Sequence, residues 1–309
     1  MKTSDPLVTV LMPVYNGEKY LSEAINSILY QTYENFEFLI IDDFSNDQSI
    51  EIIKSFPDKR IKLIINEENI GQSKTLNKGI EFAKGKYIAR LDQDDLCKKE
   101  RLEKQLKYFI KNDVTIVGSW ASVINKKSSI KTYLQYPTNN EDIINAMGIN
   151  NALAHSSVMM NKKDVLSVNG YSEEYKIAMD WDLWIRLIKN GFKIENIPEY
   201  LIGYRLHEDQ SSLNKDSKKE LFYEIITIMS YSVSLITRKP NYNAYLGWKY
   251  YFILLLCIQS LDKFYKINNC IKNIFNIRGL FELIKLFYYH KIIRTPKIYY
   301  DVPIISIKK

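Results

Sequence analysis

A regular alternation of strand-like and helix-like segments in the first hundred residues constrains the fold most. Four short runs rich in apolar residues have the length of buried strands: Val8–Pro13, Phe36–Ile41, Ile61–Ile65 and Tyr87–Leu91. Three segments between them have the spacing or the capping residues of helices: Tyr20–Leu29, Gln48–Ser55 and Ser73–Ala83. We expect Gly85 to end the last of these helices at its C′ position. This alternation predicts right-handed βαβ units and therefore an α/β fold with a parallel sheet.

Polar residues follow three of these strands. Asn16 comes after the first strand, Asp42 and Asp43 after the second, and the stretch Asp92–Asp95 after the fourth. In an open parallel sheet the carboxyl ends of the strands lie at one edge, where ligands usually bind. The sequence therefore predicts a nucleotide site at this edge.

The most acidic of these strand ends carries three aspartates within four positions, Asp92, Asp94 and Asp95. Burying uncompensated carboxylates costs several kcal/mol, so we expect the cluster to face solvent or a cation. Asp92 and Asp94 offer the hard oxygen ligands that Mg²⁺ or Mn²⁺ takes, and such an ion can hold a diphosphate. The alternative is an acidic loop that only turns the chain, because an Asp-x-Asp pattern alone is a weak signal.

Four motifs in order carry a resemblance to a known family. They are Pro13-Val14-Tyr15-Asn16, Ile40-Ile41-Asp42-Asp43-Phe44-Ser45-Asn46-Asp47, Asn69-Ile70-Gly71 and the stretch from Gly85 to Asp95. Over residues 7–212 the chain resembles the family 2 glycosyltransferases of the GT-A fold, which have a Rossmann-like, mostly parallel sheet flanked by helices. The resemblance implies a transferase that depends on Mn²⁺ or Mg²⁺ and uses a nucleoside-diphosphate sugar, usually a UDP-sugar.

The resemblance also implies roles for individual residues on the donor side. Asp43 would accept the N3–H of the base, which favours uracil over cytosine, whose N3 is only an acceptor. Asp92 would meet the ribose hydroxyls, Asp94 would ligate the metal, and Asp95 would support that loop. The alternative for Asp43 is a helix-capping turn. The full donor set is Pro13, Val14, Tyr15, Asp43, Asp92 and Gln93.

The stretch Ala178–Leu187 has apolar residues at helical spacing, with Asp180 near its start. From the residues alone, Asp180 is more simply an N-cap. The resemblance implies instead that Asp180 is the base that takes the proton of the acceptor hydroxyl. Met179 departs from the family pattern, which has an acid there, and its effect on the pKa of Asp180 has no fixed sign. Trp181 packs in the core or offers a face to a sugar ring.

Three more residues complete the expected site. His155 is either a hydrogen-bonded structural residue or a contact on the acceptor side. The resemblance implies that His207 completes the metal shell or contacts the diphosphate, while Arg205 offsets its charge. Imidazole suits Mn²⁺, whereas Mg²⁺ prefers oxygen ligands. We expect Asp94 and Asp180 to converge on one sugar–phosphate junction.

Charge divides the chain of 309 residues. Residues 1–224 carry 30 basic and 33 acidic side chains, whereas residues 225–309 carry 13 and 3, so the excess behind the net charge of +7 lies in the tail. We expect a catalytic domain at 1–212, with a nucleotide-sugar half at 1–100 and an acceptor half at 101–212. Residues 213–309 read as a helical, basic and aromatic extension. It either packs on the domain or contacts the inner membrane face peripherally; no motif supports nucleic-acid binding.

Cysteine content and hydropathy point to the cytoplasm. Three cysteines without a CxxC pair fit a reducing compartment and exclude a disulfide framework. The N-terminus lacks the pattern of a signal peptide, and the longest apolar run, Tyr250–Ile258, is too short to span a bilayer. We therefore expect a cytoplasmic protein that is not integral to the membrane.

The resemblance, together with these observations, implies an inverting hexosyltransferase that moves a sugar from a UDP-sugar to a hydroxyl of a glycan or lipid-linked acceptor. The product would belong to a bacterial surface polysaccharide such as capsule or lipopolysaccharide. One alternative is a nucleotidyltransferase acting on sugar phosphates. In such enzymes the turn after the first strand is normally basic and glycine-rich, whereas in this chain the turn at residues 13–17 contains one glycine, Gly17. The other alternative is a non-catalytic sugar-nucleotide-binding protein.

Overall fold

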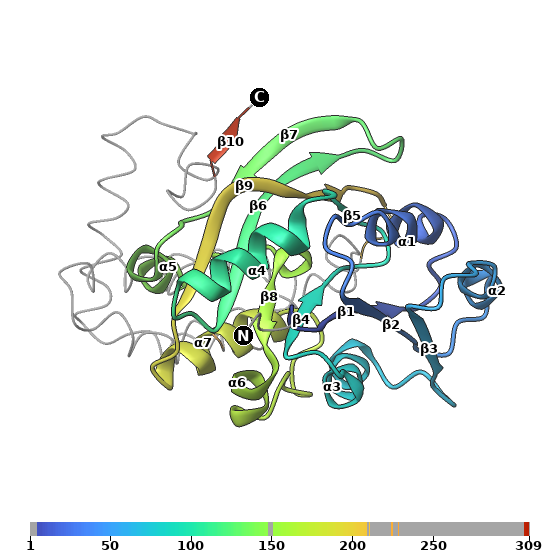
Figure 1. The fold of residues 1–309 in the computed structure, drawn as a ribbon, viewed down its shortest axis with the longest axis horizontal. Helices are drawn as coiled ribbons and strands as arrows, with labels where there is room; N and C mark the ends of the chain where they lie inside the picture. Colours follow the sequence, from blue (N-terminus) through green and yellow to red (C-terminus); the bar gives the residue numbers. More distant parts are fainter. Residues whose placement is uncertain are drawn as a thin grey trace, which may run out of the picture.

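One mixed sheet organises the part of the chain that the computed structural model describes, which is residues 5–147, 151–208, 210, 224, 228 and 306–308. Its ten strands in that part are β1 Val8–Val14, β2 Phe36–Asp42, β3 Ile61–Ile65, β4 Tyr87–Arg90, β5 Leu96–Cys97, β6 Ile116–Ile124, β7 Ile130–Gln135, β8 Met159–Asn161, β9 Ile194–Arg205 and β10 Ser306–Lys308. The helices are α1 Leu21–Leu29, α2 Ser49–Lys54, α3 Gln72–Phe82, α4 Arg101–Lys111, α5 Asn140–Met147, α6 Lys162–Ser167 and α7 Met179–Lys189, with a 3₁₀ turn η1 at His155–Ser157. The predicted α/β architecture is confirmed (Figure 1).

Strands β3, β2, β1 and β4 run parallel in that order, so their carboxyl ends share one edge. The register pairs Val14, the last residue of β1, with Asp42, the last residue of β2. Beyond β4 the sheet continues through β8 and β6, each antiparallel to its predecessor, and β9 then runs parallel to β6. Short β8 therefore joins the nucleotide half to the second half of the sheet.

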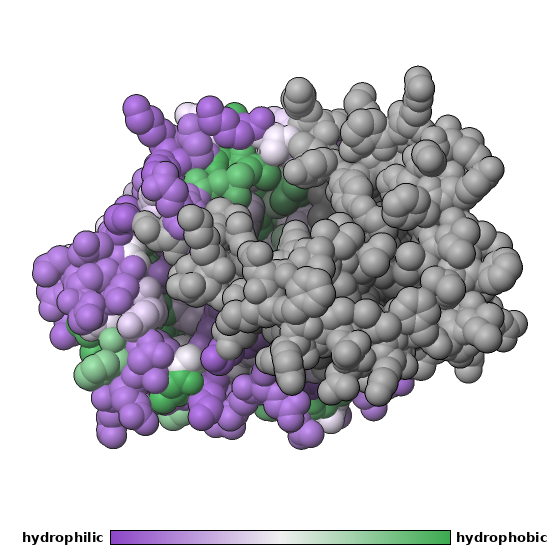
Figure 2. All heavy atoms as spheres, turned by 180° about the vertical axis from the view of Figure 1, so that it is seen from behind, coloured by the Kyte–Doolittle hydropathy of each residue, from purple (hydrophilic) through white to green (hydrophobic). Residues whose placement is uncertain are grey.

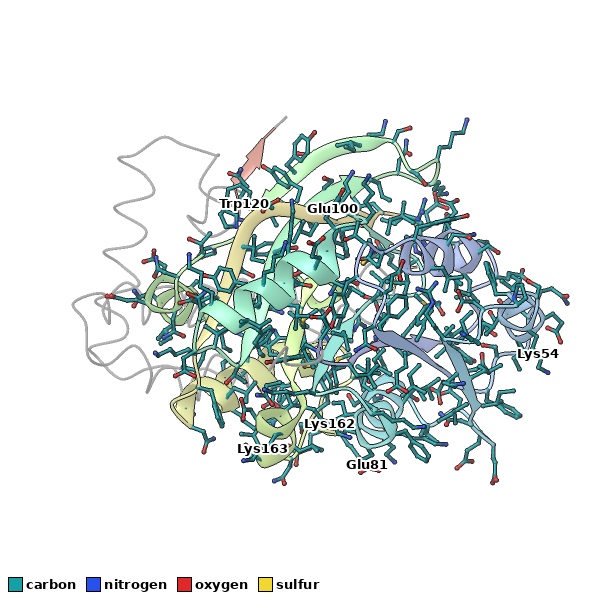
Figure 3. The ribbon with its side chains drawn as sticks, viewed as in Figure 1. Lys54, Glu81, Glu100, Trp120, Lys162 and Lys163 are labelled. Atoms are coloured by element: carbon teal, nitrogen blue, oxygen red, sulfur yellow. The ribbon has the colours of Figure 1, made fainter. Side chains whose placement is uncertain are left out.

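Two hydrophobic cores cover the two faces of the sheet. Alternate residues of β1 face opposite sides, so Leu11 packs with α3, α5 and α7, whereas Val10 and Met12 pack with α1, α2 and α4. Every residue of β1 and β2 is buried, as expected for central parallel strands covered on both faces. Charged side chains such as Lys54 and Glu81 point outward from the helices that surround this core (Figure 3).

Gly85 does not end α3 as the sequence predicts. The helix stops at Phe82, its cap Ala83 has a non-helical backbone, and Gly85 does not adopt a positive φ angle. Gly85 is needed for a different reason, because a Cβ atom there would lie 2.4 Å from the backbone nitrogen of Thr9. The Thr9 hydroxyl accepts a hydrogen bond of 2.9 Å from the Gly85 N–H. Close approach of this loop to β1 therefore explains the glycine.

The expected C-terminal extension falls almost wholly outside the described residues, as does the apolar run Tyr250–Ile258. Within it, the backbone of residues 306–308 forms β10, which pairs with β7, and is therefore a strand and not a helix. Within the described residues, no helix combines the length and the apolar character that crossing a bilayer requires. Seen from behind, the described surface is largely hydrophilic, with smaller hydrophobic areas (Figure 2).

Candidate functional site

The carboxyl ends of β1 and β2 form the first part of the site. Pro13 and Val14 belong to β1 and are buried, so their side chains support this edge from within the sheet. Tyr15, the next residue, is 48% exposed. Its backbone N–H donates to the side chain of Gln93 and its carbonyl accepts from the same side chain, at 2.8 and 3.0 Å. Gln93 therefore joins the turn after β1 to the acidic loop after β4.

Asp43 is buried beside this turn and its carboxylate already accepts three hydrogen bonds. One oxygen accepts from the side-chain amide of Asn66 and from the Ile70 N–H, at 2.7 and 3.0 Å. The other oxygen accepts from the Gly71 N–H at 2.9 Å. Asp43 therefore orders the loop that precedes α3, and it does not cap a helix with its side chain. The second oxygen keeps an acceptor position that a ligand N–H can use.

Asp92 lies at the exit of β4 and is paired with the fully buried Arg90. Its other contact is Ser156 in η1, whose hydroxyl donates to the carboxylate at 2.7 Å. Burial opposes ionisation of Asp92, but the charge of Arg90 outweighs it and lowers the pKa to about 2. Asp92 is therefore a fixed anion and a hydrogen-bond acceptor near neutral pH.

Asp94 and Asp95 differ from Asp92 in their surroundings. Asp94 accepts from the Nε2 atom of His207 at 2.7 Å, and the His207 ring packs on that of Tyr20 with centroids 4.9 Å apart. Asp95 is buried; one oxygen accepts from the Arg205 N–H, and the other has no partner among the described residues. Burial and the charges of Asp94 and Asp92 raise the pKa of Asp95 well above its usual range.

This donor set fits a divalent cation. Carboxylate oxygens of Asp92, Asp94 and Asp95 all lie within 4.8 Å of one another. His207 lies outside this group; its Nε2 is hydrogen-bonded to Asp94, and its buried Nδ1 has no partner among the described residues. The unpartnered oxygen of Asp95 is a buried acceptor that a nearby cation would satisfy. Hard oxygen ligands with one imidazole suit Mn²⁺, and the oxygens alone suit Mg²⁺.

Arg205, the last residue of β9, holds the acidic loop in place. It is fully buried, its Nε donates to the carbonyl of Asp94 at 2.7 Å, and it forms an ion pair of 3.0 Å with Glu23 in α1. Its guanidinium also lies over the ring of Tyr20, 4.5 Å from the centroid. Arg205 therefore links α1, the acidic loop and the end of β9, which is a larger role than offsetting ligand charge.

Asp180 lies in the first turn of α7, one residue inside the helix, and not at its N-cap, which is Ala178. Its carboxylate accepts from the Trp181 N–H and from the side chain of Asn151, both at 2.7 Å. The side chain is only 8% exposed. Burial raises the pKa of Asp180 to about 6. A carboxylate with this pKa is ionised at neutral pH and is basic enough to take a proton.

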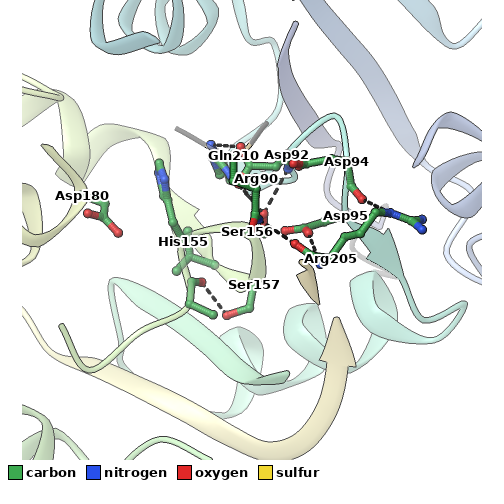
Figure 4. A network of polar contacts seen from close by, with 12 residues as sticks. Arg90, Asp92, Asp94, Asp95, His155, Ser156, Ser157, Asp180, Arg205 and Gln210 are labelled. Atoms are coloured by element: carbon green, nitrogen blue, oxygen red, sulfur yellow. Dashed lines mark hydrogen bonds and ion pairs between the residues drawn. The ribbon is translucent and has the colours of Figure 1, made fainter. Parts of the chain in front are cut away.

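The acidic loop and Asp180 influence the same buried side chains. Burial raises the pKa of Tyr171; the charge of Arg90 opposes this rise, and the negative charges of Asp180 and Asp92 add to it. The Tyr171 hydroxyl contacts His155 Nε2 at 2.8 Å, and burial together with Arg90 holds the pKa of His155 well below its usual value. In Figure 4, His155 lies between Asp180 and the acidic loop. His155 is therefore a neutral spacer between the two acidic groups.

Comparison with known proteins identifies the family. The family model described as "Glycosyl transferase family 2" matches residues 9–169, about half of the chain. The chain belongs to this family.

Curated relatives of this family 2 glycosyltransferase span most of its length. An uncharacterized glycosyltransferase of Methanocaldococcus jannaschii is 36% identical over 81% of this chain and 87% of its own length. The O-antigen biosynthesis glycosyltransferase WbnJ of Escherichia coli is 33% identical over 80% and 95%. A third relative, 32% identical over 70% and 83%, is the E. coli UDP-Glc:alpha-D-GlcNAc-diphosphoundecaprenol beta-1,3-glucosyltransferase WfgD.

Solved structures support the GT-A fold. The crystal structure of S. aureus TarS residues 1–349 in complex with UDP-GlcNAc superposes with a TM-score of 0.60. It shares 19% sequence identity with the present glycosyltransferase and covers 80% of this chain and 71% of that one. The expected fold is therefore confirmed at the level of architecture.

Two contacts support the glycosyltransferase's helix α7; the sequence predicted a core position as one of two roles for Trp181, but it gave no signal of the second contact. Trp181 is buried, and its ring N–H donates to the Met147 carbonyl at 3.0 Å, so it supports α7 from the core. Glu224, also buried, accepts from the backbone N–H groups of residues 176, 177 and 178 at 2.7–3.0 Å. A remote carboxylate thus holds the start of the helix that carries Asp180. A glutamate 44 positions after Asp180 gives no local signal of this contact.

Proposed function

We propose that the protein is an inverting, metal-dependent glycosyltransferase. It would move a sugar from a UDP-sugar to a hydroxyl of a glycan or lipid-linked acceptor during synthesis of a bacterial surface polysaccharide. The observation that carries the proposal is Asp180, a buried carboxylate whose pKa burial raises to about 6. Asp180 lies near enough to the acidic loop that both Asp180 and Asp92 affect the pKa of Tyr171. That is the combination a base needs beside a nucleotide-sugar site.

The donor side has support from three residues. Asp43 keeps one acceptor position for a base N–H, the exposed ring of Tyr15 lies one residue beyond β1, and ionised Asp92 can accept from ribose hydroxyls. WfgD is named for a UDP-Glc donor and TarS was crystallised with UDP-GlcNAc, which supports a UDP-sugar for this chain too. The nature of the sugar is left to experiment.

Asp94 and His207 would hold the cation, with Asp95 beside them. When bound, the ion would neutralise charge on the leaving diphosphate, which is worth several kcal/mol in such reactions. Arg205 would keep the Asp94 backbone in place for this purpose, through the bond to its carbonyl.

Asp180 would act on the acceptor side. Its carboxylate would take the proton of an acceptor hydroxyl as the oxygen attacks the anomeric carbon. The bond from that carbon to the diphosphate oxygen breaks on the opposite face, so configuration inverts and the nucleoside diphosphate leaves. General-base help of this kind is worth roughly 10²–10⁴ in rate. WfgD, named for a diphosphoundecaprenol-linked acceptor, supports a lipid-linked acceptor here.

The test uses purified full-length protein and a panel of UDP-hexoses and their N-acetylated forms, with Mn²⁺ or Mg²⁺. We expect metal-dependent release of UDP from one donor, and transfer once a suitable acceptor is supplied. Asp180→Asn should abolish transfer while UDP binding persists. A non-catalytic sugar-nucleotide-binding protein predicts instead that Asp180→Asn leaves every measurable activity unchanged, and that result would refute the role proposed for Asp180.

A further inference from the structure

Phe44 combines two unfavourable properties at the edge of the nucleotide site. It follows Asp43 directly, its side chain is 53% exposed, and its backbone has a φ of 66°, in the left-handed region. For a bulky residue without a polar side chain this conformation is a genuine outlier, because the Cβ atom crowds the following carbonyl. An exposed phenyl ring buries little apolar surface in return. Phe44 therefore costs the fold stability without an evident structural gain.

The other non-glycine residues with positive φ among those described are of a different kind. They are Asn16, Ser128 and Asn169. Asparagine tolerates this conformation because its short polar side chain bonds locally, and serine is small and polar. Strained positions with unsuitable residues occur most often where a ligand is held.

Contacts from both sides fix the backbone at Phe44. The N–H of Asp43 donates to the carbonyl of Val14 at 2.7 Å, and the N–H of Ser45 donates to the Asp42 carboxylate at 2.9 Å. The turn after β1 is joined to the same segment, because the Asn16 N–H donates to the Ser45 hydroxyl at 2.9 Å. The surroundings therefore impose the left-handed backbone at Phe44.

The position of Phe44 in the chain indicates what its ring can contact. Phe44 lies beyond Asp43, which keeps a free acceptor position, and next to the strand end that carries the exposed ring of Tyr15. An acceptor beside two exposed aromatic side chains suits a planar heteroaromatic ring that bears an N–H group. We propose that Phe44 packs its ring against the base of the donor nucleotide and so sets affinity for the nucleoside part of the donor. This inference rests on the proposed use of a UDP-sugar.

The test distinguishes the contribution of the Phe44 ring to binding from the effect of its left-handed backbone. Phe44→Asn removes the ring but suits the left-handed conformation, whereas Phe44→Tyr keeps the ring. Binding of UDP in the presence of Mn²⁺ is measured by isothermal titration calorimetry, with pyrophosphate as a probe that lacks the base. We expect Phe44→Asn to weaken UDP binding by roughly 5- to 150-fold, the range found when an aromatic residue under a base is removed. Pyrophosphate binding should not change, and the melting temperature should stay equal or rise.

A matched control is Phe82→Asn, which removes another exposed phenylalanine, 57% exposed, at the end of α3. It should leave UDP affinity unchanged, as should Phe44→Tyr to within about threefold. Unchanged UDP affinity in Phe44→Asn overturns the inference, and so does an equal loss for pyrophosphate or a loss accompanied by a lower melting temperature. Failure of the wild-type protein to bind UDP at all would instead overturn the proposed function and the inference with it.

Discussion

Replacing Asp180 with asparagine should stabilise the protein near neutral pH while it removes sugar transfer. Burial raises the pKa of Asp180 from 3.8 to about 6, so the folded protein binds this proton more tightly than the unfolded chain does. Stability then falls as the pH rises from about 4 through about 6, because over that range the unfolded state releases the proton first. Above pH 6 the folded protein carries a buried charge that asparagine would not have.

The size of the effect follows from the shift. About two pKa units at 1.36 kcal/mol each give an upper limit of about 3 kcal/mol at pH 7.5. Asparagine keeps an oxygen for the Trp181 N–H, but its amide nitrogen would face the amide nitrogen of Asn151, which costs about 1–2 kcal/mol. A net gain of about 1–2 kcal/mol remains. For a protein of this size each kcal/mol raises the melting temperature by about 2–4 °C.

Thermal unfolding of both proteins between pH 4.5 and 8 measures this difference. The two curves should converge near pH 5 and separate above pH 6, and kcat/KM of the wild type should fall as the pH drops through about 6. The control Asp113→Asn removes an exposed carboxylate and reports how much of a shift comes from net charge alone. If Asp180→Asn melts below the wild type at pH 7.5 by the same margin as at pH 5, burial does not destabilise the Asp180 charge and the reasoning is wrong.

Three further changes test the supports of the site. Asp94→Asn should weaken Mn²⁺ binding by at least roughly 10-fold in a calorimetric titration, and a chelator should abolish UDP release from the wild type; activity that survives both would exclude the metal site. Arg205→Lys should lower the unfolding free energy by roughly 2–4 kcal/mol in urea, because an ammonium cannot reproduce the fork of contacts that a buried guanidinium makes; an unchanged midpoint would contradict this. Glu224→Gln should cost roughly 1–3 kcal/mol by weakening bonds to three backbone N–H groups and should lower kcat more than it changes KM. A matched Glu81→Gln change at an exposed position should do neither.

The parallel half of the sheet was predictable because its signals are local. Each strand there is a short run rich in apolar residues. Asp43 and Asp92 follow directly on two of these strands, so topology alone brings them to one edge. Gly85 was predicted for the wrong reason, since its need for close approach to Thr9 depends on a partner 76 residues away. The pKa of Asp180 was open for a similar reason: its sign depends on burial, which no local pattern reports.

The pairing of strands in the second half of the sheet was not predictable either, because local patterns do not report it. The strand β8 has only three residues and joins β4 to β6, and so short a run cannot be told from a loop by periodicity. Yet it follows directly on η1, which carries His155 and the serine that orients Asp92. The proposed acceptor side therefore rests on resemblance and not on a local pattern.

Arg205 and Glu224, which hold the acidic loop and the start of α7 in place, lie outside the segment that the family model matches. The family model ends at residue 169, before Asp180, Arg205 and Glu224. Arg205 reaches back 182 positions to Glu23 and fixes the acidic loop between them, while Glu224 fixes the start of α7. Each contact is a single charged group that satisfies buried or backbone partners, so losing one leaves several polar groups unpaired at once. The geometry between the acidic loop and Asp180 thus depends on long-range charge contacts, and a fragment limited to residues 9–169 would keep Asp92, Asp94 and Asp95 without the contacts that fix their position relative to α7.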